Sequence, residues 1–292
     1  MAVFEFKMEV TPSAVPEIEE RLGEREEQHL MVLEDKPSGR AWLTGYFDSE
    51  SSAKAGWAEF GASFQSAWQV GESSISELAD KDWKESYKEH FRAWKFGRLH
   101  WVPVWERGTF AAPPGDEVLW LDPGMAFGTG NHETTRLVVE RLVELTAEKG
   151  VAGRVIDAGC GSGILALSAV KLGYRQVAAF DNDPLAVDVS RENAELNGLA
   201  SRVEFYVGDL VTGLAGRQAE LVLANIQADV LMAFAPQLLG AVAPGGVLVL
   251  SGILAIELAK VREAFAEQGP GWRAETHTLG EWSELTLARP AS

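Results

Sequence analysis

The chain has little cysteine, little positive charge and no long apolar run, and each shortage excludes a class of protein. Its 292 residues include one cysteine, Cys160, so an internal disulfide is impossible and a structural zinc site has no support. Lys and Arg number 26 against 43 Asp and Glu, and the net charge of −17 argues against a protein held on nucleic acid by phosphate contacts. The acidity suits a basic protein partner, or it serves solubility alone.

Signals for membranes, export and metal binding are also missing. The longest apolar run, 246–259, is too short and too interrupted to span a bilayer. The N-terminal residues MAVFEFKMEV are acidic where a signal peptide would be basic and then apolar. The five histidines are scattered without the spacing of metal ligands. We therefore expect a cytoplasmic protein without a metal, long enough for two domains.

Residues 1–80 predict a small α+β domain. Its strands are predicted at 3–10, 30–33, 41–47 and 73–78. Two helices are predicted between them, one from about 11 to 22 and one that Asp48 or Ser49 can cap. The resulting order, β-α-β-β-α-β, is typical of a ferredoxin-like domain. It contains no catalytic constellation, so we expect either a structural appendage or, by fold-level analogy, a domain that selects a substrate.

The next segment predicts a connection to a larger domain. Residues 81–94 combine charged residues with a stripe of aromatics, which predicts a linker helix that docks on a neighbouring domain. A short strand is expected over 98–105, where Pro103 favours a position at a sheet edge. Residues 95–292 are then expected to form the larger domain.

The larger domain is organised around the stretch 155–165, VIDAGCGSGIL. It reads as a buried strand, a glycine loop and the first turn of an apolar helix, which together bring backbone N–H groups close to a ligand. A dinucleotide loop needs G-x-G-x-x-G/A, but its third glycine position is Ile164. The remaining G-x-G-x-G pattern, with Asp157 before it, is expected of a loop that holds the amino-acid end of S-adenosylmethionine. Glycines required only for steric reasons are the alternative.

Strands and helices alternate from this stretch to the end of the chain. Further strands are predicted at 176–181, 203–209, 219–225 and 247–250, and an antiparallel pair at 272–278 and 282–288. Helices are predicted near 184–197, 230–239 and 254–266. This alternation predicts an α/β fold, a doubly wound Rossmann-like sheet of seven strands whose last hairpin is antiparallel. A ligand belongs at the carboxyl ends of its strands.

Four of these strands end in polar side chains: Asp157, Asp181, Asp209 and Asn225. Asp181 follows the glycine loop by about twenty residues, where a carboxylate can accept both hydroxyls of a ribose. Asp209 can accept from an adenine amino group, so both residues suit a nicotinamide nucleotide as well as S-adenosylmethionine. The missing third glycine and Asn225, whose carbonyl can accept from an amine N–H, favour S-adenosylmethionine. Taken singly, Asp157 can hold loop N–H groups, and Asp209 and Asn225 can form turns.

A second glycine-rich segment, LDPGMAFGTGNHETTRL at 121–137, precedes the sheet. Its end can cap a helix, and its glycines favour a close approach of the backbone to a ligand. Thr129, Thr134 and Thr135 would direct hydroxyls at that ligand, unless the segment is an ordinary connecting loop. We interpret His132 as a residue that hydrogen-bonds within the loop, with a general base as the alternative.

These motifs resemble the PrmA family of bacterial methyltransferases that act on large-subunit ribosomal protein eleven. DPGMAFGTGNHETT, VIDAGCGSGILALSAVKLG, AFDNDP, NAELNG, VGDL and LANI occur in the family's order. The resemblance covers nearly the whole chain, because that family also has a small ferredoxin-like recognition domain and a linker helix. The first of these segments is more specific than the glycine loop, which is common to many methyltransferases.

The resemblance implies N-methylation of lysine side chains of the ribosomal protein, with an N-terminal α-amine as a further target. We also expect a monomer, and the net charge of −17 argues against direct binding of nucleic acid. Four positions match residues that bind S-adenosylmethionine: Thr135, Gly159, Asp181 and Asn225. Three more would line the pocket and the approach of the amine: Phe127, Gly128 and Thr129. The predicted cofactor site also includes Thr134, Asp157, Gly161, Gly163 and Asp209, and the predicted catalytic residues are Asn225 and Thr129.

Three alternatives stay open at this point. A methyltransferase for another amine, in a nucleic acid or a small molecule, would share every cofactor feature. An NAD-dependent oxidoreductase would require tight NAD binding and the third loop glycine, whose position in this chain is Ile164. A non-catalytic module would bind the ribosomal protein without transferring a methyl group.

Overall fold

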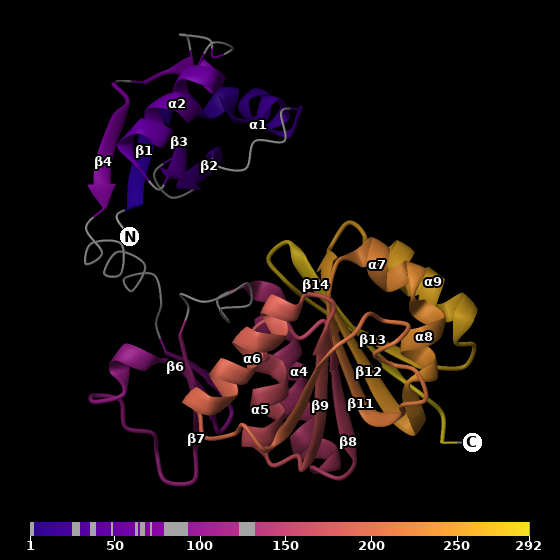
Figure 1. Cartoon of the computed structure of the whole chain (residues 1–292). Coiled ribbons are helices and arrows are strands. Elements are labelled where there is room, and N and C mark those ends of the chain that lie inside the picture. The colour runs from indigo at the N-terminus through magenta and orange to yellow at the C-terminus, as the bar shows by residue number, and fades with distance from the viewer. Residues whose placement is uncertain are drawn as a thin grey trace. The chain divides into compact units, whose positions relative to one another are not determined.

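The computed structural model describes residues 3–24, 30–35, 39–47, 49–61, 64, 68–70, 72–78, 93–122 and 132–291. The chain divides into two compact units, Met1–His90 and Phe91–Ser292 (Figure 1). The linker helix expected over 81–94 lies largely outside the described residues, and Trp94 at its end begins a strand.

The first unit is a four-stranded antiparallel sheet with two helices. Its strand order is β2-β3-β1-β4, that of the expected ferredoxin-like domain. Its elements are β1 (Val3–Val10), a 3₁₀ helix (Pro12–Ala14), α1 (Val15–Glu24), β2 (Leu30–Asp35), β3 (Arg40–Phe47), α2 (Glu50–Gly61) and β4 (Ser74–Leu78). Ser49 caps α2, because its Oγ accepts from the N–H of Ser52 at 3.1 Å, whereas Asp48, the other predicted cap, lies outside the described residues.

Alternation along β1 places the core of this unit on one face of its sheet. Phe6, Met8 and Val10 are buried under the helices, and the ring of Phe6 stacks on that of Trp57 in α2 at 4.8 Å. The unit therefore has a hydrophobic core of its own.

A three-stranded sheet opens the second unit, and the sequence pattern predicts only its central strand. β5 (Trp94–Phe96) pairs antiparallel with β6 (Leu99–Pro103), which pairs parallel with β7 (Glu117–Leu121). The prediction that the strand with Pro103 lies at an edge is wrong, since β6 lies in the middle. Pro103 is tolerated there because it is the last residue of the strand, just before a 3₁₀ helix (Val104–Glu106).

The large sheet has seven strands in the order β10-β9-β8-β11-β12-β14-β13. They are β8 (Arg154–Ala158), β9 (Gln176–Asp181), β10 (Val203–Val207), β11 (Ala219–Asn225), β12 (Val242–Leu254), β13 (Arg273–Leu279) and β14 (Trp282–Ala288). The first five in this order are parallel, and β14 is antiparallel to both neighbours. The predicted doubly wound sheet with an antiparallel last hairpin is confirmed. Its order reverses between β8 and β11, which is where such sheets bind ligands.

Helices cover both faces of this sheet (Figure 1). One face carries α4 (Glu133–Lys149), α5 (Ile164–Leu172) and α6 (Pro184–Leu196), and the other carries α7 (Ala228–Ala233), α8 (Ala235–Gly240) and α9 (Leu258–Gln268). The single helix predicted over 230–239 is broken at Phe234, because Pro236 cannot continue a preceding helix. The helix predicted from 254 begins only at Leu258.

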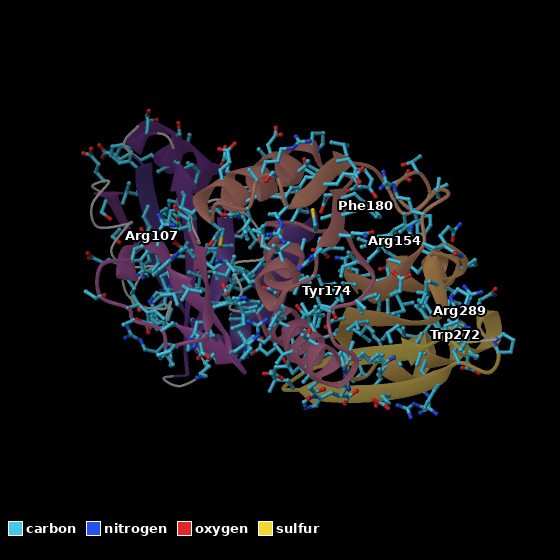
Figure 2. All side chains as sticks on the ribbon, turned by 90° about the horizontal axis from the view of Figure 1, so that it is seen from below. Arg107, Arg154, Tyr174, Phe180, Trp272 and Arg289 are labelled. Atoms are coloured by element: carbon cyan, nitrogen blue, oxygen red, sulfur yellow. The ribbon has the colours of Figure 1, made fainter. Side chains whose placement is uncertain are left out.

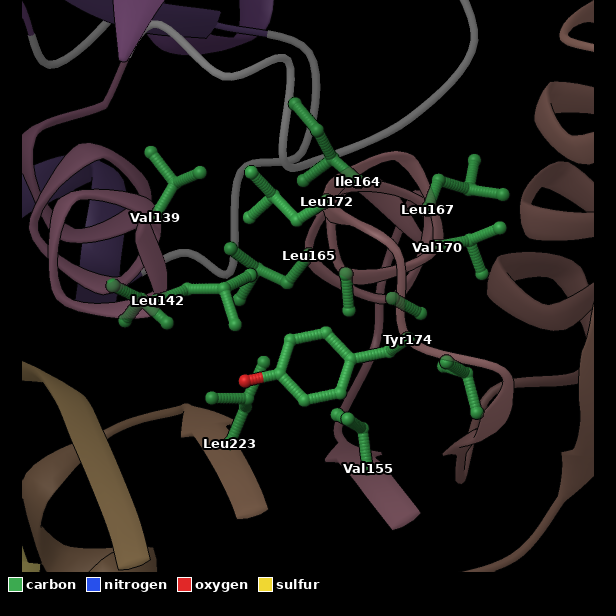
Figure 3. Packing of buried hydrophobic residues seen from close by; sticks show 14 of the residues in the cluster. Val139, Leu142, Val155, Ile164, Leu165, Leu167, Val170, Leu172, Tyr174 and Leu223 are labelled. Atoms are coloured by element: carbon green, nitrogen blue, oxygen red, sulfur yellow. The ribbon is translucent and has the colours of Figure 1, made fainter. Parts of the chain in front are cut away.

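Burial on both faces explains why strands such as β11 are almost continuously apolar. Leu223 packs with Leu142, Leu165 and Tyr174 under α4 and α5 (Figure 3). Its neighbour Val222 faces the opposite cluster, beneath α7, α8 and α9. Two packed layers thus fix the carboxyl ends of the strands.

Candidate active site

The glycine loop connects β8 to α5 at the point where the strand order reverses. Gly159, Gly161 and Gly163 have φ angles of 73°, 53° and 75°, a region that favours glycine. A Cβ added at Gly159 would lie 2.6 Å from the Cγ2 of Ile226, and one at Gly163 would lie 3.0 Å from Ser190. Backbone conformation and close packing therefore explain why these loop positions are glycine. The same loop leads into the N-terminus of α5, where the first N–H groups of a helix are available to a ligand.

Asp181 ends β9 and holds the glycine loop from the neighbouring strand. Its Oδ2 accepts from the N–H of Gly161 at 2.9 Å, and its Oδ1 accepts from the N–H of Asp183 at 3.1 Å. A carboxylate has about four acceptor sites, so each oxygen retains capacity for another donor. This geometry suits a pair of hydroxyl groups.

Asp157, the acidic residue in front of the loop, is fully buried. Its Oδ2 accepts from the N–H of Ala166 at 3.0 Å, while its Oδ1 is buried without a hydrogen-bond partner among the residues that the structure describes. Burial, together with the nearby carboxylate of Asp181, raises the pKa of Asp157 to about 7. A buried carboxylate oxygen without a donor is a place where a cation or an N–H group is strongly favoured.

We expect Asp157→Asn to change how the stability of the ligand-free protein depends on pH. The folded-state pKa of Asp157 lies above its usual 3.8, so the folded protein retains a proton that the unfolded chain releases. The free energy of unfolding should therefore fall between about pH 4 and pH 7, by at most about 1.4 kcal/mol per pH unit from this group. The amide does not titrate, so the variant should gain stability relative to the wild type as the pH rises.

Urea denaturation at about pH 5 and about pH 8 measures this difference. Asp188→Asn, an exposed carboxylate on α6, is the matched control. Parallel pH profiles for Asp157→Asn and the wild type would contradict the elevated pKa.

Asn225 ends β11 and is bonded to a residue 90 positions earlier in the chain. Its Nδ2 donates to the Oγ1 of Thr135 at 3.3 Å, and Thr135 is buried in the first turn of α4. This bond orients the amide and uses one of the two N–H donors of its nitrogen. The carbonyl Oδ1 of the same amide is the acceptor that remains for a ligand.

His132 caps the N-terminus of α4. Its Nδ1 accepts from the N–H of Thr134 at 3.4 Å and hydrogen-bonds to the Thr134 Oγ1 at 2.8 Å. Its ring lies edge-on to that of Trp282, with centroids 4.9 Å apart. The structure thus shows the loop-bonding role of His132. Because the Thr134 hydroxyl is engaged in this cap, its expected contact with a cofactor stays a prediction.

Asp209 forms a turn after β10. Its Oδ1 accepts from the N–H of Val211 at 2.9 Å and from the N–H and hydroxyl of Thr212 at 2.6 and 2.8 Å. The bond from the Thr212 backbone, followed by that from its hydroxyl, lowers the pKa of Asp209. The turn uses Oδ1, so Oδ2 is the oxygen that an adenine amino group could reach.

The predicted residues at the ends of β8 to β11 therefore share one edge of the sheet. Phe127, Gly128 and Thr129 lie outside the described residues, and their roles stay predictions. Sequence reasoning missed Gly252, whose φ is 82° and whose added Cβ would lie 2.4 Å from the carbonyl oxygen of Ile226. Its only signal in the sequence was a glycine two residues after the apolar strand predicted at 247–250.

Other features of the second unit lie away from this edge. A cavity of about 530 Å³ opens near Arg154, Arg217 and Gln237 at the amino ends of the strands. Figure 2 looks toward that side, with Arg154, Trp272 and Arg289 labelled. Within the described parts of the chain, no group of three or more His, Cys, Asp or Glu is arranged to hold a metal ion. Every helix among the described residues is too short or too polar to cross a membrane.

Comparison with known proteins agrees with this geometry. The model of the family described as "Ribosomal protein L11 methyltransferase (PrmA)" matches residues 7–290. The ribosomal protein L11 methyltransferases of Pseudomonas paraeruginosa and Geobacter metallireducens are each 46% identical, over 68% and 73% of this chain. Those matches span 65% and 68% of the relatives' own lengths.

A solved structure gives the same assignment. The crystal structure of ribosomal protein L11 methylase from Lactobacillus delbrueckii subsp. bulgaricus is similar with a TM-score of 0.60 and 32% identity, over 68% of this chain and 100% of that one. The family match extends through both units and includes the glycine loop, Asp181 and Asn225. The chain therefore belongs to the ribosomal protein L11 methyltransferase (PrmA) family.

Proposed function

We propose that this protein transfers methyl groups from S-adenosylmethionine to amines of ribosomal protein L11, chiefly lysine side chains. Family membership supports the reaction class and the substrate. The structural observation that carries the proposal is the Asn225 amide, which Thr135 holds at the end of β11 beside the glycine loop. An oriented carbonyl at this position suits an incoming amine.

The residues at this edge fit S-adenosylmethionine. The unpaired Oδ1 of Asp157 favours a ligand that donates a hydrogen bond or carries positive charge, and such a ligand would lower the pKa that burial raises. Asp181 is proposed to accept the ribose hydroxyls, and Asp209 to accept from the adenine amino group through Oδ2. Gly161, Gly163 and the first turns of α4 and α5 are proposed to surround the amino-acid end.

The proposed chemistry requires mainly positioning by the chain's own residues. When bound, S-adenosylmethionine supplies an electrophilic methyl group on a sulfonium. Asn225 Oδ1 would accept an N–H of the amine and so direct its lone pair, with Thr129 proposed to assist. Desolvation of a lysine lowers the pKa of its ammonium group, which favours the neutral amine without a strong general base. Such positioning can contribute about 7–11 kcal/mol to lowering the barrier.

We further infer a division of labour between the two units. Residues 1–80 are proposed to recognise ribosomal protein L11, residues 81–94 to link the units, and residues 95–292 to bind the cofactor and catalyse transfer. The first unit has a core of its own, and no sequence motif for cofactor binding falls in it. We expect the protein to act as a cytoplasmic monomer that does not bind nucleic acid directly.

One assay tests the proposed function. The protein is incubated with S-adenosylmethionine labelled in its methyl group and with unmodified ribosomal proteins and ribosomal RNA. We expect label in the L11 band and methylated lysine after hydrolysis. Label in the RNA and none in protein would instead indicate a methyltransferase for a nucleic acid. Absence of label together with calorimetric binding of NAD would indicate an oxidoreductase.

A further inference from the structure

The carboxyl edge of the large sheet continues past Asn225 to the ends of β12, β13 and β14. We infer that three short segments there, 227–229, 255–257 and 280–282, form a docking surface for the polypeptide that carries the amine. We call this surface the acceptor rim, and Ile256 is its apolar anchor. The inference rests on the proposed function and adds the surface that receives the substrate.

Ile256 is exposed and held in a fixed position. Its side chain is 89% exposed, the highest value among the large hydrophobic residues of the described chain. The turn that carries it is closed by two reciprocal bonds: the Glu257 N–H donates to the Leu254 carbonyl at 2.8 Å, and the Leu254 N–H donates to the Glu257 Oε2 at 3.1 Å. The Ala255 N–H donates to the carbonyl of Glu281 at 2.8 Å and ties this turn to the β13–β14 hairpin. An anchor on a preorganised turn binds with little loss of backbone entropy.

The acceptor rim is continuous with the candidate active site. Asn225 pairs in register with Ser251 of β12, and the Ile226 N–H donates to the Ser251 carbonyl at 3.1 Å. Gly252 then packs against the carbonyl of Ile226 before the chain reaches Ile256. A polypeptide that covers Ile256 would therefore lie on the same edge of the sheet as the Asn225 amide, five residues along the chain from Ser251.

Trp282 connects the other side of the rim to the same amide. It pairs with Leu254 across the β12–β14 ladder, and its ring contacts the ring of His132. His132 caps α4, whose first turn contains Thr135, the partner of Asn225. The rim thus borders the groups that hold the amide in place.

The charge of the rim suits a lysine-bearing segment. Its three segments contain Asp229, Glu257 and Glu281 and no lysine or arginine. Carboxylates around an apolar anchor attract a cationic polypeptide and repel an acidic one. The occupant we assign is therefore the basic segment of the substrate protein that flanks the methylated amine, with an apolar residue seated on Ile256.

The test compares Ile256→Ser with Ile256→Leu and with Val151→Ser, an exposed β-branched control residue that is 38% exposed and precedes the amino end of β8. We expect Ile256→Ser to raise the KM for ribosomal protein L11 about tenfold, the loss expected when one isoleucine no longer becomes buried. The kcat at saturating protein and the calorimetric Kd for S-adenosylmethionine should stay at wild-type values. Ile256→Leu and Val151→Ser should both behave as the wild type.

The outcomes test the acceptor rim and the proposed function separately. A KM for Ile256→Ser equal to that of Val151→Ser, with normal labelling by the wild type, would overturn the acceptor rim alone. No labelling by the wild type would overturn the proposed function. In that case, the affinity of the full chain for L11 tests the acceptor rim. Equal Kd values for the wild type and Ile256→Ser would overturn it.

Discussion

Asn225→Ala should lower kcat about a hundredfold at saturating S-adenosylmethionine and saturating ribosomal protein L11, because small errors in positioning cost about this much. Alanine removes the carbonyl that is proposed to orient the amine, and it breaks the bond to Thr135. The Kd for the cofactor should change far less, since Asp181 and the glycine loop are proposed to carry most of that binding. Single-turnover transfer of labelled methyl groups measures the effect.

Two further variants separate orientation of the amide from damage to the fold. Thr135→Val removes the hydroxyl that holds the Asn225 amide, so it should lower kcat, and Thr135→Ser should largely restore it. Gln176→Ala, which removes an exposed amide at the amino end of β9, is the matched control and should be silent. Turnover of Asn225→Ala at the wild-type rate would remove Asn225 from the mechanism.

Asp181→Ala should raise the Kd for S-adenosylmethionine about a hundredfold. Two hydrogen bonds from ribose hydroxyls to a charged carboxylate contribute about 1.5–3 kcal/mol each, part of which water replaces. The substitution also deprives the Gly161 N–H of its acceptor and loosens the loop. Isothermal titration calorimetry at several temperatures measures the affinity directly.

The control for this variant is Asp188→Asn, which removes a charge from the exposed side of α6. Asp181→Asn retains an acceptor for the Gly161 N–H and should fall between the wild type and Asp181→Ala. Circular dichroism confirms that each variant is folded. Wild-type affinity in folded Asp181→Ala would refute the ribose assignment.

The large sheet could be predicted because its central strands β8 and β11 are apolar on both faces and polar residues stand at or next to their ends. Asp157, Asp181 and Asn225 share an edge as a consequence of parallel strand direction, which a sequence pattern does reveal. The three residues of β5 are too few to show any periodicity, and β6 and β7 pair across a connection that no local signal marks. Single residues also changed the predicted elements: Pro236 divides the helix predicted over 230–239 into α7 and α8.

Contacts within the site were harder to predict than the fold. The bond between Asn225 and Thr135 joins residues 90 positions apart, so it depends on how α4 packs on the sheet. The cap formed by His132 depends on its ring position against Trp282, which belongs to the last strand of the chain. The residue types indicate which hydrogen bonds these side chains can form, whereas tertiary packing determines the partners that they have within the protein.

The contact of Ile226 with two glycines restricts how this site can diverge during evolution. Gly159 makes room for its side chain and Gly252 makes room for its carbonyl, so the ends of β8, β11 and β12 are interlocked around one residue. A larger residue at either glycine would displace Ile226 and, with it, the neighbouring Asn225. Substitutions at these three positions should therefore be strongly epistatic, and a lineage that changes one of them would have to change the others together.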